Sequence, residues 1–382
     1  MLLAPDIHPT TDFLSLAEQL GLRFAERAAR HDADGTFVHD NYDDLKAHRF
    51  FSAGVPAELG GGGLTHAQLC EVIRILARHC GSTALAYSMH SHLVAAAVWR
   101  YCHGKPAEKL LRGIAENEWV LVSTGAADWL GSNGTLTRVE GGFRFSATKI
   151  CCSGSPRGDL MITSGVLEDG QEGMGPEVLH FPVKFASEGV RCHDDWDVLG
   201  MRATGSHTWT LEDVFVPEDS IALCRPQSGW HPSWSVVLTV ANPLIMAAYL
   251  GVTEAACQIA RDLAARRPAG AEPFATLGEM ENQLAAATLA WKGLVDGARD
   301  YDFGPHLDRA NAALVHKTLV SRACRAAVDL ASEAGGGATF ARATGFERLF
   351  RDVQGVRWHP LPESRQVVFT GRHALGRSPL AD

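Results

Sequence analysis

The pattern of hydrophobic residues changes twice along the 382-residue chain, near Trp119 and near Pro232. Before Trp119 and after Pro232, apolar residues recur every three to four positions, which predicts helices that bury one face. Between these two points the segments are short, bounded by Gly or Asp and rich in residues that favour strands. The order of helices, strands and helices predicts an α+β fold.

The two changes divide the chain into three parts. We expect an N-terminal helical domain over residues 1–118, a middle β-barrel domain over 119–228 and a C-terminal four-helix bundle over 229–382. At roughly 150 residues per domain, two or three packed units are expected for this length. Individual helices are predicted from Phe13, capped by Thr11 or Asp12, over 65–77, 91–99, 106–116, 244–265, 277–302 and 308–334, and after Pro362. Strands are predicted over 120–123, 135–140, 143–146, 160–164, 178–183 and 207–217.

Charge and cysteine content narrow the class of protein. The net charge is −9, without a basic patch, which argues against nucleic acid or an anionic membrane surface as a partner. The nine cysteines include no CxxC pair, which favours reduced thiols over a metal site or a disulfide framework. The N-terminus does not read as a signal peptide, and no run of about 20 apolar residues is present. We therefore expect a cytoplasmic protein without a metal.

Three motifs carry a family resemblance. The first is Gly131-Ser132 followed by Gly-Gly-Phe-Arg-Phe-Ser-Ala-Thr-Lys-Ile-Cys-Cys-Ser-Gly at 141–154. The second is Gly-Met-Arg-Ala-Thr-Gly-Ser at 200–206, and the third is Glu-Arg-Leu-Phe-Arg-Asp at 347–352, after three glycines. Together they resemble the acyl-CoA dehydrogenase superfamily. The resemblance implies a flavin cofactor and a dimer of dimers, hence a homotetramer.

The resemblance also implies cofactor contacts. Ser132 matches a loop serine at the flavin pyrophosphate, and Ser153 matches a residue that hydrogen-bonds the reactive edge of the flavin. Cys151 replaces a tryptophan that stacks beside the flavin, although we favour the interpretation that Cys151 and Cys152 are small buried strand residues. The glycine turn that approaches the cofactor is retained as Gly335 and Gly336. FAD is favoured, but residues 266–274 lack the family's Arg-x-x-Phe-Gly element for adenine, so FMN stays open.

The catalytic carboxylate of a dehydrogenase is missing. A base must lie within hydrogen-bond reach of the proton that it removes. In most of the family a Glu stands at the place of Pro360, and in one branch at the place of Ala241. Neither residue can accept a proton. The nearest replacement in sequence is Glu363.

His359 points to a different reaction. In the flavin-dependent monooxygenases of this fold, a His matches His359 and a Ser matches Ser153. Imidazole has a pKa near 6.5, so at neutral pH it can either hold a proton or give one away. In a dry pocket such a group could hydrogen-bond and protonate the product of reduced flavin and oxygen. His90 and His92 could line the same cavity, although we prefer helix or core contacts for both. We interpret Trp196 and Trp209 as packing residues, and we interpret Arg351-Asp352 as a structural ion pair.

Three functions follow. We favour a flavin-dependent monooxygenase that oxygenates a small organic substrate. It would need a separate flavin reductase, because the chain lacks a GxGxxG nicotinamide fingerprint after a strand. The second function is a dehydrogenase of an acyl-CoA or acyl-carrier thioester with Glu363 as displaced base. The third is a non-catalytic flavin or acyl-thioester binding protein.

Overall fold

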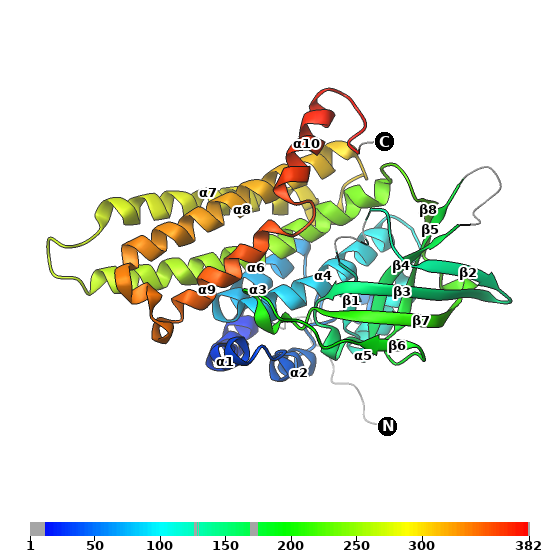
Figure 1. Ribbon diagram of the computed structural model, residues 1–382, viewed down its shortest axis with the longest axis horizontal. Coiled ribbons are helices and arrows are strands. Elements are labelled where there is room, and N and C mark those ends of the chain that lie inside the picture. The colour runs from blue at the N-terminus through cyan, green and yellow to red at the C-terminus, as the bar shows by residue number, and fades with distance from the viewer. Residues whose placement is uncertain (1–11, 126–127, 129, 169–174, 381–382) are drawn as a thin grey trace.

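The computed structural model describes residues 12–125, 128, 130–168 and 175–380. Figure 1 shows the strands at one end of the molecule and the longest helices extending away from them to the other end. Along the chain, helices come first, strands second and helices again last. This order confirms the predicted α+β fold.

The N-terminal helices begin where capping side chains are available. Asp12 accepts hydrogen bonds from the backbone N–H groups of Leu14 and Ser15, so it is the cap of the first helix. Thr65 and Gln68 form a reciprocal capping box. The helices are α1 (Phe13–Asp34), α2 (His39–Ala47), α3 (His66–His79), α4 (Gly81–Cys102) and α5 (Glu108–Asn117), with the 3-10 turn η1 (Ala57–Leu59).

The described strands form one eight-stranded sheet. Its hydrogen-bonded order is β6-β7-β3-β2-β4-β5-β8, and β1 pairs in parallel with β4 beside this path. The strands are β1 (Leu121–Ser123), β2 (Thr135–Val139), β3 (Gly142–Cys152), β4 (Leu160–Leu167), β5 (Glu177–Lys184), β6 (Val190–Cys192), β7 (His207–Pro217) and β8 (Leu223–Pro226). The 3-10 turns η3 (Ser155–Arg157), η4 (Arg202–Thr204) and η5 (Glu218–Ser220) connect them.

The C-terminal helices pack around α6. They are α6 (Pro232–Ala265), α7 (Phe274–Ala298), α8 (Leu307–Gly335), α9 (Phe346–Val353) and α10 (Glu363–Ala374). The 3-10 turns η6 (Arg299–Tyr301), η7 (Gly336–Phe340), η8 (Arg342–Thr344) and η9 (Gln354–Arg357) lie between them. By length and hydropathy α6 could cross a membrane, but 94% of its most apolar window is buried inside the protein. It is therefore a core helix, packed against α3, α4, α7 and α8.

Two predicted helices begin later than the observed ones. The prediction placed a start at Leu244, directly after Pro243, a residue that normally disrupts a helix interior. In the structure α6 continues through Pro243, whose carbonyl accepts a hydrogen bond from Trp291 Nε1 at 2.9 Å. The prediction over 91–99 missed the first ten residues of α4, in which every residue is buried. A helix buried on all sides has no apolar stripe to detect.

Arg351 and Asp352 have separate partners rather than each other. Arg351 donates to both carboxylate oxygens of Asp32, at 2.9 and 2.6 Å, and to Glu347 at 2.7 Å. Asp352 is buried and accepts a hydrogen bond from the backbone N–H of Met201. The predicted ion pair between the two neighbours is wrong. Both residues nevertheless fix α9, Arg351 to α1 and Asp352 to the loop between β6 and β7.

Candidate active site

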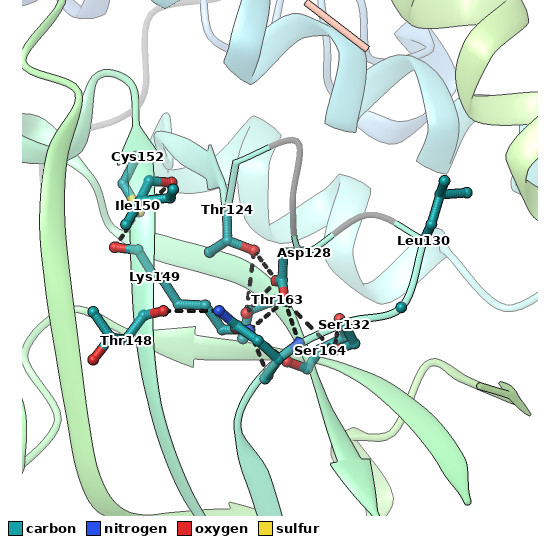
Figure 2. Close-up of polar contacts among 12 residues, drawn as sticks. Thr124, Asp128, Leu130, Ser132, Thr148, Lys149, Ile150, Cys152, Thr163 and Ser164 are labelled. Atoms are coloured by element: carbon teal, nitrogen blue, oxygen red, sulfur yellow. Dashed lines mark hydrogen bonds and ion pairs between the residues drawn. The ribbon is translucent and has the colours of Figure 1, made fainter. Parts of the chain in front are cut away.

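A buried lysine organises the Gly-Ser loop. The Lys149 side chain on β3 has no exposed surface, and Figure 2 shows it pointing to Asp128, Ser132 and Ser164. Its Nζ donates to Asp128 Oδ1, to Ser164 O at 2.8 Å, and to Asn133 O and Oδ1 at 2.9 and 2.7 Å. Burial lowers the pKa of Lys149, and the Asp128 carboxylate opposes that shift. The ion pair joins β3, β4 and the loop into one rigid unit.

Ser132 is held at the surface of this unit. Its backbone φ is 62°, in the left-handed region, and its Oγ lies 2.7 Å from Ser164 Oγ. Ser132 Oγ also donates to Asp128 Oδ1 at 3.5 Å, a long contact that a phosphate oxygen could replace as the acceptor of this hydrogen. This arrangement is compatible with the predicted phosphate contact of Ser132.

A chain of hydroxyls fixes Ser153 at the end of β3. Ser153 Oγ lies 2.7 Å from Ser206 Oγ, which lies 2.7 Å from Thr204 Oγ1. Thr204 donates to Met201 O at 3.0 Å, and the backbone of Gly154 donates to Thr204 O at 2.8 Å. The segment 200–206 therefore positions Ser153.

The two adjacent cysteines differ in exposure. Cys152 is fully buried, but Cys151 is exposed and has a φ of 57°. The pairing of β3 with β7 shifts register between Lys149 and Cys152, so Cys151 lies in the irregular part of the strand. The interpretation of both as buried strand residues is confirmed for Cys152 and wrong for Cys151.

His359 is hydrogen-bonded to a buried tyrosine. Tyr249 Oη, in the middle of α6, lies 2.7 Å from His359 Nε2. Burial raises the pKa of Tyr249 well above its ordinary value, so the phenol keeps its proton. Burial lowers the pKa of His359 to about 3, so the imidazole is neutral near pH 7. Tyr249 is therefore the donor and Nε2 the acceptor, which leaves the imidazole proton on Nδ1.

Two further basic groups surround His359. Lys317, on α8, is 1% exposed and donates from Nζ to Leu361 O at 3.0 Å. Burial lowers the pKa of Lys317 to about 8, and its charge further disfavours protonation of His359. His92 also influences His359, and its Nδ1 lies 3.3 Å from Ser88 O. Burial lowers the pKa of His92 to about 4.

Other aromatic and histidine candidates pack in the core. His90 bridges two backbone groups, because its Nε2 lies 2.8 Å from Phe51 O and its Nδ1 accepts from Leu121 N at 2.9 Å. Trp196 Nε1 donates to a backbone carbonyl at 3.3 Å. Trp209 packs edge-on against a phenylalanine ring, with 4.6 Å between centroids. His90 is a core contact, and the two tryptophans pack against the protein, as expected.

Glu363 is engaged by Arg322. Its Oε1 accepts two hydrogen bonds from Arg322, at 2.6 and 3.0 Å. The hydrogen bond from Arg322 lowers the pKa of Glu363, which makes the carboxylate a weaker base. Ala241 is buried within α6, and Pro360 follows His359. The geometry thus weakens the case for Glu363 as a displaced base.

The glycine turn lies far from the sheet within one chain. Gly336 ends α8 with a φ of 69°, and a Cβ there would stand 2.8 Å from Arg267 Nη2. Arg267 follows α6 and donates to Ala334 O at 2.7 Å. Figure 1 shows the connection between α6 and α7 at the end of the bundle opposite the sheet. Gly335 and Gly336 therefore do not meet Ser132 and Ser153 within a single chain.

Three residues of the site were missed by the sequence analysis. Asp128 precedes the Gly-Ser loop, Tyr249 lies in an apolar helix, and Lys317 interrupts the apolar pattern of α8. Only Lys317 left a signal, because a lysine at a buried helix position needs a specific partner. No group of three or more His, Cys, Asp or Glu suited to a metal occurs among residues 12–125, 128, 130–168 and 175–380.

Family models match most of the chain. Residues 17–118 match the model described as acyl-CoA dehydrogenase, N-terminal domain, and residues 227–359 match acyl-CoA dehydrogenase, C-terminal domain. With the helix–sheet–helix fold, these matches place the chain in the acyl-CoA dehydrogenase superfamily.

Within the superfamily, the chain stands nearest to flavin-dependent monooxygenases. It is 27% identical to a dibenzothiophene monooxygenase of Mycolicibacterium goodii, over 96% of this chain and 94% of that protein. It is 28% identical to the amino sugar nitrososynthase RubN8 of Streptomyces rubradiris, over 96% and 90% of the two chains. The structure of KijD3 with FMN and a dTDP-linked amino sugar is similar with a TM-score of 0.86 and 27% identity, over 98% of this chain and 95% of that one.

Proposed function

We propose that this flavin-dependent monooxygenase holds its flavin between Ser153 and His359 and transfers one oxygen atom of O2 to a small organic substrate. The observation that carries the proposal is the neutral His359, which is hydrogen-bonded by Tyr249 at 2.7 Å. Pro360 and Ala241 occupy the two places where a dehydrogenase of this family keeps its carboxylate. When bound, reduced flavin supplies the electrons that activate oxygen.

The side chains at β3 have the chemistry that a flavin needs. Ile150 and Cys151 are exposed on β3, which ends just before Ser153, and they offer an apolar surface to a planar ring. Ser153 offers a hydroxyl to the edge of that ring, and Ser132 can donate to a phosphate oxygen in place of its long contact with Asp128. The described residues therefore fit a flavin with its phosphate toward the Gly-Ser loop.

FMN is favoured over FAD for this site. The structure of KijD3, which is 27% identical to this chain, is described as a complex with FMN. The segment 266–274 also lacks the Arg-x-x-Phe-Gly spacing that would bind an adenine ring. The earlier preference for FAD is replaced by FMN in this proposal.

His359 would serve the reaction as a hydrogen-bond donor. Because Tyr249 occupies Nε2, only Nδ1–H is free, and Nδ1 makes no hydrogen bond within the described chain. A donor at this atom can stabilise negative charge that develops on oxygen beside the flavin. Burial, and then the charge of Lys317, disfavour protonation of His359, so the imidazole stays in this form as the pH falls below 7.

The substrate class is proposed from the relatives. Dibenzothiophene monooxygenase and amino sugar nitrososynthase carry names of compounds with sulfur or nitrogen centres. We propose a small molecule with an oxidisable sulfur or amine nitrogen. A separate flavin reductase would supply reduced FMN in the cytoplasm. A homotetramer would allow Gly335 and Gly336 of one copy to approach the flavin of another.

A rapid-mixing experiment tests this function. The protein with one equivalent of photochemically reduced FMN is mixed with aerated buffer, and the flavin spectrum is followed. We expect a transient absorption band that belongs to neither reduced nor oxidised FMN, and no anaerobic bleaching of oxidised flavin by acyl-CoA. Rapid anaerobic bleaching without the transient would support the dehydrogenase, and failure to bind flavin would support the non-catalytic protein.

A further inference from the structure

A pocket outside the site described above is lined by several arginines. It has a volume of about 470 Å³ and opens between the C-terminal end of α1, the loop that joins β6 to β7, and the segment from Arg342 to α9. Neither Ser153 nor His359 lines it. Its volume lies within the range of pockets that hold small ligands, about 300–1,000 Å³.

Two of the lining arginines are already engaged. Arg351 holds Asp32 and Glu347, as described above. Arg202 donates from Nε to Asp32 O at 2.8 Å, and from Nη1 to Val198 O at 2.9 Å and to the exposed Asp197 at 3.1 Å. These contacts rigidify the wall of the pocket, and they consume the lining carboxylates.

The other two arginines have unused donors. Arg342 is exposed and Arg348 is half-buried, and neither side chain makes a hydrogen bond or ion pair within the described chain. Burial raises the pKa of Asp352 and the charge of Arg348 opposes that shift, although no hydrogen bond or ion pair joins the two side chains. The carboxylates of Asp32, Glu347 and Asp197 are held by Arg351 and Arg202, so Arg342 and Arg348 keep N–H donors free for an anion.

We propose that this pocket binds the phosphate group of a small organic phosphate. A guanidinium presents paired N–H donors that match phosphate oxygens, and Arg342 and Arg348 offer two such groups. The remaining wall is formed in part by Ala29, Val198 and Leu199, which offer an apolar surface to the organic part of the ligand. Two sources present the same group to Arg342 and Arg348: another metabolite, or an FMN whose phosphate lies in this pocket instead of at the Gly-Ser loop.

Calorimetric titration of the full-length protein with inorganic phosphate tests the pocket. We expect saturable binding that weakens at least tenfold in the double variant R342Q/R348Q and less in R348K, which keeps the charge. R365Q is the matched control, because Arg365 is an exposed arginine on α10 outside the pocket. Circular dichroism melting of each variant verifies that it is folded.

Titrations with FMN and riboflavin distinguish the two sources. If the flavin supplies the phosphate, R342Q/R348Q weakens FMN binding and leaves riboflavin binding unchanged. If another metabolite supplies it, the double variant loses inorganic phosphate but binds both flavins as the wild type does. No phosphate binding by the wild type, or equal binding by R342Q/R348Q and R365Q, overturns the proposal. None of these readouts depends on the oxygen reaction.

Discussion

Replacing Lys149 by methionine should destabilise the protein strongly. The ion pair with Asp128 is buried on both sides, with 0% and 7% of the two side chains exposed. Methionine removes the cation and leaves the carboxylate with Thr124, Thr163 and the backbone N–H of Asn133 as partners. Breaking a buried pair by removing one partner typically costs about 3–5 kcal/mol, and we expect a loss of this size in the free energy of unfolding.

Urea denaturation followed by tryptophan fluorescence, at one fixed protein concentration, measures this loss. Lys109→Met is the matched control, because Lys109 is exposed on α5 and should change stability by at most about 0.5 kcal/mol. The double variant Asp128→Asn, Lys149→Met should recover part of the loss, since it leaves no unpaired charge. A loss below about 1 kcal/mol in Lys149→Met, or no recovery in the double variant, would refute the reasoning.

Three further predictions concern the site. Tyr249→Phe removes the hydroxyl that fixes His359, so the decay rate of the transient absorption should change about tenfold. FMN affinity, measured by fluorescence quenching, should stay constant. The folded-state pKa of His359, about 3, lies below that of free imidazole, about 6.5. Only the unfolded chain therefore gains this proton between pH 6.5 and 5, and wild-type stability should fall more than that of His359→Gln over this range. Glu363→Gln should leave the oxygen reaction unchanged, because Glu363 is paired with Arg322; loss of activity would restore it as a base.

The sequence predicted the order of the elements better than the interior contacts. Periodicity locates helices and strands that have one buried face, which is why α1, α10 and the strand at 207–217 lie where they were expected. It fails where both faces are buried, as in the first ten residues of α4. It also fails where packing overrides a local signal, as at Pro243 within α6.

The candidate site was predictable only in part. The motifs that carry the resemblance contained Ser153 and Lys149, and register with the family singled out His359. The partner of His359 is Tyr249, 110 positions earlier in an apolar helix, and no spacing rule connects the two. Buried polar pairs of this kind depend on how distant elements pack. For the same reason, the correct partners of Arg351 could not be read from its neighbour in sequence.

The most direct test of the central claim compares wild type with His359→Ala in the rapid-mixing experiment. If neutral His359 donates a hydrogen bond at the flavin, the wild type should show the transient absorption, and the variant should lose it and release hydrogen peroxide at once, with unchanged FMN affinity. Identical traces and equal peroxide release from the two proteins would contradict the claim that His359 defines an oxygen-using site.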